Sequence, residues 1–281
     1  MPGTLYVVAT PIGNLEDVTL RALRILREVS AIAAEDTRRT SRLLQHYSIS
    51  TPTTSLHAHN EDGKTPGLIE RLRGGESIAL VSDAGTPVVS DPGARLVAAA
   101  HAAGLRVEPI PGPNAALAAI SASGLGGDEF LFVGFPPARA RARQEWLGRL
   151  AAEPRPLVLY EAPHRIRATL QDMLTQLGDR TVALGRELTK AHEELVVRPI
   201  SDHLAKIGAG RGEYTLVVTP AVLVTNNPEV PSARQLVTEF GRLIENDACT
   251  RRAAIKQLAV KYGLSARAVY SLVEQGRSSV D

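Results

Sequence analysis

One loop of this sequence carries the residues of a ligand-binding site. The apolar run at 79–81 ends in the small and polar segment SDAGTP at 82–87, which is typical of a buried strand that delivers a loop to the mouth of a parallel sheet. The loop has no Lys-Ser or Lys-Thr after its glycine and no G-x-G-x-x-G spacing, which excludes a P-loop and a dinucleotide turn. Its backbone groups and the carboxylate of Asp83 suit amine, hydroxyl and sulfonium groups better than a polyphosphate.

A first polar cluster follows another expected strand and could supply a general base. It consists of Glu35, Asp36 and Arg38. A carboxylate within reach of a hydroxyl could accept its proton, and the cluster follows its strand at the same end of the sheet as the loop 82–87. In the alternative interpretation, Asp36 or Thr37 caps the first turn of a helix. Arg38 could instead bind a phosphate group.

A second polar cluster follows a later expected strand. It contains Arg186, Glu187, Lys190 and Glu193. A carboxylate or a neutral lysine here could also act as the base. The alternative is a solvated helix face with ordinary ion pairs, because the charges recur at three- and four-residue spacing.

The segment with His57, His59, Glu61 and Asp62 contains residue types that bind metals. The same residues suit a polar surface loop or hydrogen bonds to a polar partner. We therefore expect no metal site.

Strand patterns alternate with helical patterns along most of the chain, which is typical of α/β domains with parallel strands and crossover helices. The expected strands are 5–10, 31–34, 77–81, 106–110, 130–135, 157–161, 181–185, 194–198 and 214–219. The expected helices cover apolar positions 20–26 and 43–44 and residues 94–103, 114–123, 141–152, 164–177 and 201–207.

Glycine-rich and proline-containing segments divide the chain. The glycines at 124–128 predict a hinge, and the segment 225–231 predicts a linker. We expect an N-terminal α/β domain at 1–124, a second α/β domain at 125–224 and a helical tail at 232–281.

The tail has a pattern similar to a helix-turn-helix. A helix is expected at 251–261, a turn at 262–265, and a second helix, capped by Ser265, that ends near residue 274. Such a hairpin could contact nucleic acid, or it could pack on the body or on a second subunit.

Composition indicates an ordinary globular protein without a membrane segment. The chain has 44% hydrophobic and 22% charged residues, and no apolar run approaches the roughly 20 residues that span a bilayer. The start of the sequence lacks a basic region followed by an apolar stretch, so we expect no secretion. The single Cys249 fits a reducing compartment, and the cytoplasm is the expected location.

Positive charge is unevenly distributed although the net charge is only +2. An expected helix start carries three arginines, Arg139, Arg141 and Arg143. Positive charge at a helix N-terminus interacts unfavourably with the helix dipole, and contact with phosphate would explain why it is present there. A plain solvated face is the alternative. The tail is also basic and includes Arg251 and Arg252. Aromatic residues make up only 4% of the chain, which argues against a base-stacking platform.

Six segments in the same order carry a family resemblance. They are LYVVATPIGNLEDV at 5–18, AEDTR at 34–38, SDAGTP at 82–87, PGPNA at 111–115, LYEAPHR at 159–165 and GRELTKAHE at 185–193. With these segments the chain resembles the bacterial small-subunit ribosomal RNA cytidine 2′-O-methyltransferases, a branch of the tetrapyrrole methylase superfamily. Other branches of that superfamily have Gly-Asp-Pro where this chain has Asp-Ala-Gly-Thr-Pro.

The resemblance implies two α/β domains that hold S-adenosyl-L-methionine (SAM) in the cleft between them, and a homodimer. It implies methylation of the 2′-hydroxyl of a cytidine in the decoding region of 16S rRNA, within the small ribosomal subunit. The nearest alternatives are a methyltransferase for a small-molecule tetrapyrrole and a ligand-sensing, nucleic-acid-binding regulator.

The expected site residues fall into three groups. SAM contacts are expected at Thr10, Pro11, Asp83, Ala84, Gly85, Thr86, Pro87, Asn114, Ala115, Ala116, Tyr160, Glu161 and Ala162. The residues expected to be catalytic are Lys190, Glu187 and Asp36. RNA contacts are expected at Arg38, Arg139, Arg141, Arg143, Arg251 and Arg252.

Overall fold

The computed structural model describes residues 1–208, 210–221, 233–245, 250–262 and 266–278. It divides into two compact units, Met1–Ala221 and Val222–Asp281. Among the described residues, no helix is both long enough and apolar enough to cross a membrane. The predicted linker at 225–231, Cys249 and the Ser265 cap lie outside the described residues.

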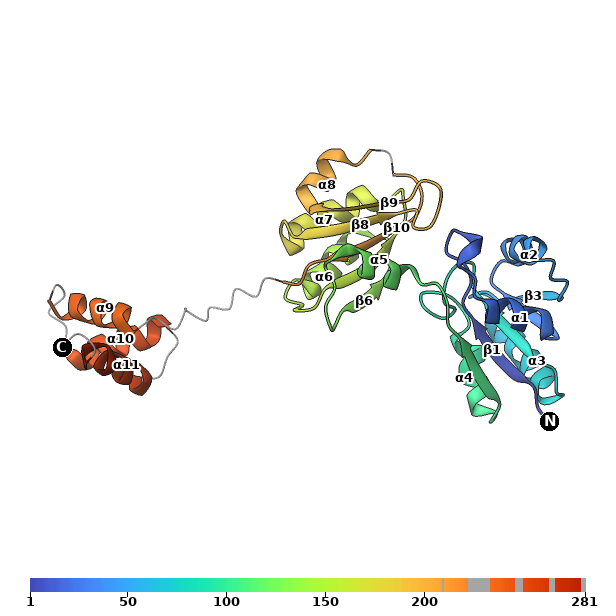
Figure 1. Cartoon of the computed structure of the whole chain (residues 1–281), viewed down its shortest axis with the longest axis horizontal. Helices are drawn as coiled ribbons and strands as arrows, with labels where there is room; N and C mark the ends of the chain where they lie inside the picture. The colour runs from blue at the N-terminus through green and yellow to red at the C-terminus, as the bar shows by residue number, and fades with distance from the viewer. Residues whose placement is uncertain (209, 222–232, 246–249, 263–265, 279–281) are drawn as a thin grey trace. The chain divides into compact units, whose positions relative to one another are not determined.

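The first sheet is entirely parallel, with strand order β3-β2-β4-β1-β5. Its strands are β1 (Thr4–Val8), β2 (Ala31–Ala34), β3 (Thr53–Ser55), β4 (Ile78–Val81) and β5 (Arg106–Ile110). The helical segments between them are η1 (Leu15–Asp17), α1 (Leu20–Glu28), α2 (Thr37–His46), α3 (Glu61–Arg73) and α4 (Ala94–Ala102) (Figure 1).

Helices cover both faces of this sheet. Residues of α1 and α2, such as Leu26 and Leu43, pack with Ala79 and Val81 of β4. The intervening Leu80 points to the opposite core, which α3 and α4 close. The alternation along β4 explains why the whole strand is apolar, since a strand covered on both faces has no solvated side.

The strand β3 and the helix α3 were not predicted from the sequence. The strand β3 is short and only half-buried. The helix α3 contains Gly63, Pro66 and Gly67, which interrupt its apolar periodicity. Burial of Leu68 and Leu72 against the sheet outweighs this weak local preference.

The second sheet is mixed, which corrects the expectation of parallel strands throughout. Its order is β6-β7-β10-β8-β9, and only the β6–β7 pair is parallel. The strands are β6 (Leu131–Gly134), β7 (Leu157–Glu161), β8 (Thr181–Arg186), β9 (Glu194–Pro199) and β10 (Tyr214–Val218). The loop 187–193 between β8 and β9 is too short for a crossover helix, so this pair is a hairpin.

Four helices pack with the second sheet. They are α5 (Ala115–Ser123), α6 (Ala140–Leu150), α7 (Ile166–Leu177) and α8 (Ile200–Lys206). Ala116 and Ala119 of α5 pack with Val158 and Val217 of the second sheet. This packing favours a change from the first sheet to the second between β5 and α5, before the predicted hinge at 124–128. The division at residue 124 stays a prediction.

The described residues of the C-terminal unit form three helices, one more than the two expected from the sequence. They are α9 (Ala233–Glu245), α10 (Arg251–Tyr262) and α11 (Ala266–Ser278). Leu236 and Phe240 of α9 pack with Leu258 of α10 and with Val269 and Val273 of α11. The additional helix therefore supplies the apolar surface against which the predicted helix pair is buried.

Candidate active site

The loops after the neighbouring strands β1 and β4 are joined through their backbones. Thr10 and Gly85 form an isolated antiparallel bridge, with N···O distances of 2.8 and 3.0 Å. The Thr10 hydroxyl also donates to the carbonyl of Ser82 at 3.3 Å. Gly85 has a φ of +80°, and a Cβ there would lie 3.2 Å from Cγ2 of Ile12. The sequence SDAGTP therefore needs its glycine for both conformation and space.

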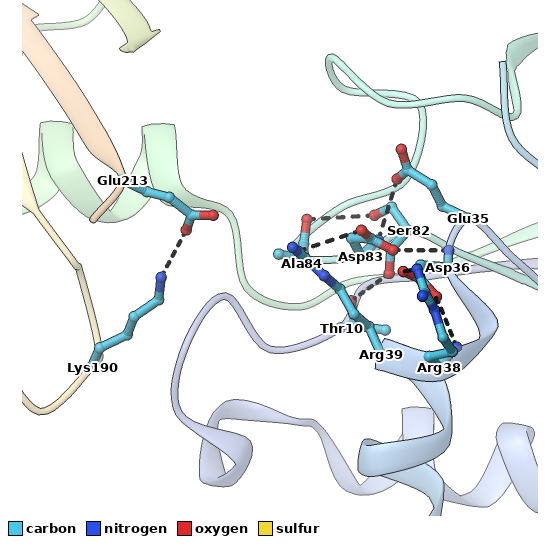
Figure 2. A network of polar contacts seen from close by, with 10 residues as sticks. All are labelled: Thr10, Glu35, Asp36, Arg38, Arg39, Ser82, Asp83, Ala84, Lys190 and Glu213. Carbon is cyan, nitrogen blue, oxygen red and sulfur yellow. Dashed lines mark hydrogen bonds and ion pairs between the residues drawn. The ribbon is translucent and has the colours of Figure 1, made fainter. Parts of the chain in front are cut away.

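Asp83 is held at the centre of a polar network, which Figure 2 shows. Its Oδ1 accepts from the backbone N–H of Asp36 at 2.9 Å, and its Oδ2 lies 3.4 Å from Nη1 of Arg39. Burial and the nearby Asp83 carboxylate raise the pKa of Glu35. The predicted proximity of the loop 82–87 and the cluster at 35–38 is therefore present in the structure.

Asp91 is an acidic residue of the site that the sequence analysis missed. It follows Val88 and Ser90, which adopt positive φ values of 74° and 67° although neither is a glycine. Burial raises the pKa of Asp91 to about 6, with smaller contributions from Glu35 and Asp83. Such backbone strain and pKa perturbation are enriched at functional sites. The repeat of Ser-Asp at 82–83 and 90–91 was the available signal.

A cavity of about 410 Å³ opens beside this network. Its volume is within the range of small-molecule sites. Both α/β sheets contribute to its wall, which includes most of the residues expected to bind SAM. Those residues are Asp83, Ala84, Gly85, Thr86, Asn114, Ala115, Tyr160, Glu161 and Ala162.

Four residues expected to bind SAM do not line the cavity. Thr10 and Ala116 are buried, and both hold the cavity wall in place. The N–H of Ala116 is shared between Oδ1 of Asn114 at 3.0 Å and the hydroxyl of Tyr160 at 3.2 Å. Pro11 and Pro87 are adjacent to lining residues, and Ile12 occupies the position in the wall that was expected for Pro11.

The cavity wall is acidic. Among the described lining residues, Glu35, Asp83 and Asp91 lie together with the cation Arg39. Glu213 also lines the cavity, but its carboxylate is paired with Lys190 at 2.8 Å. Glu161 also contributes, but its buried carboxylate is already engaged. It accepts from the N–H of Ala162 at 2.8 Å and lies 3.2 Å from Nε of Arg165. An excess of carboxylates favours a cationic ligand over a polyphosphate.

Aromatic side chains form another part of the wall. The rings of Phe135 and Tyr160 have centroids 5.5 Å apart, and Phe135 is 53% exposed. An exposed aromatic face beside carboxylates can hold a flat ring or a cationic group. Phe135 was not among the expected site residues, because a single phenylalanine after a strand carries no specific signal.

The loop 187–193 holds Lys190 as a cation. Its Nζ lies 2.8 Å from Oε1 of Glu187 and 2.8 Å from Oε2 of Glu213. Burial opposes the charge, but the hydrogen bonds to Glu187 and Glu213 outweigh it and raise the pKa of Lys190. A neutral lysine base, considered from the sequence, is therefore disfavoured. The helix-face alternative is also wrong, because these residues lie in a loop between two strands.

This loop also contacts the turn after β1. The N–H of Asn14 donates to Oγ1 of Thr189 at 3.0 Å. A Cβ on Gly13 would lie 2.5 Å from Cγ of Lys190. Glu187 and Thr189 have positive φ values of 51° and 68°. The contact thus links the two α/β halves and requires a glycine at position 13.

Asp36 acts as the N-cap of α2, the alternative that the sequence left open. Its carboxylate accepts from the backbone N–H of Arg38 at 2.9 Å and pairs with the Arg38 side chain. These hydrogen bonds lower the pKa of Asp36 to about 2. Asp36 is not among the residues that line the cavity. Its side chain is therefore poorly suited to accept a proton.

The arginines expected to bind RNA differ in accessibility. Arg38, Arg139, Arg141, Arg251 and Arg252 are exposed, although Arg141 pairs with Glu145 at 3.0 Å. Arg143 is only 5% exposed and lies 2.7 Å from Asp172. This corrects the expectation for Arg143, because its charge is neutralised inside the fold.

The histidine-containing segment has another structural role. The carboxylate of Glu61 accepts from the backbone N–H groups of Arg95 and Leu96 at 2.8 and 3.2 Å, so it caps α4. Asp62 pairs with the Arg95 side chain. Within the described part of the chain, no group of three or more His, Cys, Asp or Glu side chains could hold a metal ion.

Comparison with known proteins agrees with this architecture. The family model for Tetrapyrrole (Corrin/Porphyrin) Methylases matches residues 4–203. A protein of Synechocystis sp. named "Ribosomal RNA small subunit methyltransferase I" is 45% identical over 273 residues, which cover 96% of this chain and 97% of that protein. A protein of the same name from Halalkalibacterium halodurans is 44% identical over 279 residues, covering 97% and 95%.

Solved structures with a similar fold include methyltransferases of low sequence identity. Uroporphyrin-III-C-methyltransferase from Thermus thermophilus has a TM-score of 0.56 at 22% identity, covering 78% of this chain and 96% of that one. The methyltransferase CobJ has a TM-score of 0.60 at 20% identity, covering 78% and 95%. The matched family model and the curated relatives together show that this chain belongs to the tetrapyrrole (corrin/porphyrin) methylase family of SAM-dependent methyltransferases.

Proposed function

We propose that this protein transfers a methyl group from SAM to the ribose 2′-hydroxyl of a cytidine in the decoding region of 16S rRNA. The observation that carries the proposal is the acidic, aromatic-edged cavity in a chain 44–45% identical, over nearly its whole length, to relatives named for the small-subunit ribosomal RNA. The acceptor is the RNA of the small ribosomal subunit.

The cavity residues fit SAM in both charge and shape. Carboxylates of Asp83, Glu35 and Asp91 suit the ammonium and sulfonium groups, and Phe135 with Tyr160 offers a surface for the adenine ring. Gly85 leaves room that a Cβ would reduce. When bound, SAM supplies a methyl group on a positively charged sulfur, so the leaving group needs no further activation.

The protein's own contribution is mainly alignment. Holding an acceptor hydroxyl in line with a methyl donor can supply much of the rate acceleration. We assign Lys190, with Glu187 and Glu213, to fixing the loop 187–193 at the edge of the cavity that Leu188 lines. As a cation, Lys190 can donate a hydrogen bond but cannot accept the hydroxyl proton.

Exposed arginines are assigned to the RNA backbone. Arg38, Arg139, Arg141, Arg251 and Arg252 would bind phosphates, and such contacts weaken with salt. Reversing the charges of Arg139 and Arg141 should weaken binding to the small subunit and flatten its salt dependence. Unchanged binding across salt concentrations would contradict this assignment.

A homodimer and a cytoplasmic location complete the proposal. Because the proposed substrate is ribosomal, we expect the reaction to take place in the cytoplasm. Sedimentation of the purified protein would test the dimer directly.

The decisive experiment is transfer of labelled methyl from SAM to small subunits that lack this modification. Naked 16S rRNA and a tetrapyrrole precursor serve as competing acceptors. Label on a cytidine ribose, obtained with subunits, is the expected result. Label on the tetrapyrrole alone, or no label on RNA despite SAM binding, would contradict the proposed acceptor.

A further inference from the structure

A second cavity lies on the other face of the second sheet from α5. It has a volume of about 230 Å³ and is formed by β8, the edge strand β9 and the helix α8, which lies beside β9 in Figure 1. Val196 and Arg198 of β9 face the same side as Leu184 and Val182 of β8, their partners in the register. We call this cavity the β9–α8 pocket. Its charged and polar lining comprises Arg186, Glu194, Arg198, His203 and Lys206.

The lining is positively charged. Among the described lining residues, Arg186, Arg198 and Lys206 face one carboxylate, that of Glu194. Burial lowers the pKa of His203, and its Nε2 lies 2.9 Å from the carbonyl of Val182, so the imidazole serves as a neutral, buried anchor for α8. The charge of the pocket lining is thus positive, whereas that of the SAM cavity is negative.

The cations of the pocket lack good acceptors. Nε of Arg186 is buried and has no hydrogen-bond partner among the described residues, and its Nη1 is 3.8 Å from Glu194, beyond hydrogen-bond length. Within the part of the chain that the structure describes, Arg198 and Lys206 form no ion pair. By contrast, the buried Arg143 is matched to Asp172 at 2.7 Å. A buried donor without a partner is rare in native proteins and calls for a missing acceptor.

We propose that the β9–α8 pocket binds a backbone phosphate of the RNA substrate. A phosphate offers several acceptor oxygens to converging guanidinium and ammonium donors. The two parallel N–H groups of a guanidinium can bind two phosphate oxygens at once. The assignment rests on the proposed function, because the RNA is the expected source of the phosphate. Tyr214 lines both this pocket and the SAM cavity, so the phosphate site and the methylation site share one structural element.

Binding to the small subunit tests the RNA assignment. The double variant Arg198→Gln/Lys206→Gln removes two positive charges from the pocket while leaving the SAM cavity intact. The matched control, Lys64→Gln/Arg73→Gln, removes two exposed charges from α3. We expect roughly tenfold weaker subunit binding for the pocket variant and a salt slope reduced by about 1, because one phosphate contact is lost. The control variant and the SAM affinity of both variants should match the wild type.

A titration with inorganic phosphate tests the pocket independently of methyl transfer. The Nε–H signal of Arg186 in the NMR spectrum of the full chain should shift and saturate with phosphate, and the pocket variant should lose this response. An unresponsive wild-type signal would overturn the phosphate site, even if subunits are methylated. A normal phosphate response with control-like subunit binding would overturn the RNA assignment and leave a site for a free anion. If wild-type protein does not methylate subunits, the proposed function is wrong. The phosphate titration then still shows whether the β9–α8 pocket binds phosphate.

Discussion

The loop after β4 and the loop after β8 both follow strand ends beside the SAM cavity. The carboxylates of the first loop are only partly neutralised, whereas the lysine of the second loop is fully paired. In the first loop, burial and neighbouring carboxylates raise the pKa of Asp91 to about 6. In the second, Lys190 is held between Glu187 and Glu213 at 2.8 Å from each. Carboxylates without enough cationic partners can bind a cationic ligand. Carboxylates that are already paired with a lysine instead hold a loop in position.

Both loops carry backbone strain. Val88 and Ser90 in the first loop and Glu187 and Thr189 in the second have positive φ values without being glycine. Such conformations persist only when surrounding contacts enforce them. We therefore expect changes in the first loop to affect SAM binding and changes in the second to affect turnover.

The largest effect is expected for Asp83→Asn. The amide keeps an acceptor for the N–H of Asp36 but removes the charge, so SAM affinity should fall roughly ten- to hundredfold, as for a lost charge-assisted contact. Calorimetric titration with SAM measures it. Asp36→Asn is the matched control, because asparagine is an equally good N-cap and SAM affinity should be retained. Equal affinities for wild type and Asp83→Asn would remove Asp83 from the ligand site.

Lys190→Ala tests the role of the loop after β8. Turnover should fall at least tenfold, because small displacements of aligned reactants have large rate effects. SAM affinity should remain close to the wild-type value. Lys190→Arg keeps the cation and should recover part of the activity. If calorimetry shows that Lys190→Ala loses SAM affinity, the division of roles between the two loops is wrong.

Gly13→Ala should produce a smaller effect through the same loop. The added Cβ would lie 2.5 Å from Cγ of Lys190 and 2.7 Å from Oγ1 of Thr189, so the loop 187–193 must shift. We expect turnover to fall roughly threefold to tenfold. A Cβ on Gly63 of α3 would meet no atom of the described residues within 4 Å, so Gly63→Ala should leave turnover unchanged and stabilise the fold by roughly 0.5–1 kcal/mol. Equal turnover in the two variants would argue against a positioning role for the loop.

The smallest effect concerns the pH dependence of stability at Asp91. Its pKa is raised from 3.8 to about 6 in the folded protein, so the unfolded state releases this proton at lower pH than the folded state. The stabilising contribution is full below about pH 4 and is lost as the pH rises through 6. Asp91→Asn should flatten this fall in the free energy of unfolding, measured by chemical denaturation. If the variant showed the same pH dependence of the free energy of unfolding as the wild type, burial would not raise the pKa of Asp91.

Much of the fold could be read from local patterns, with informative exceptions. The four-residue apolar strands β2 and β4 were predicted because a strand covered on both faces is apolar throughout. The helix α3 was missed because Gly63, Pro66 and Gly67 mask its buried face. The antiparallel pairing of β7, β8 and β10 was also missed, since alternation of strands and helices does not specify which edges meet.

For the site, local sequence patterns were enough to predict the residue types and the loops that carry them: SDAGTP at 82–87, the PGPNA turn at 111–115 and the GRELTKAHE segment at 185–193. Tertiary structure decided which side chains remain available for chemistry. Asp36 is used as a helix cap, Arg143 is neutralised by Asp172, and Lys190 is paired, whereas Asp91 lines the cavity. The physical reason is that a side chain's charge state and accessibility depend on burial and on partners distant in the sequence, and only the folded chain brings these together.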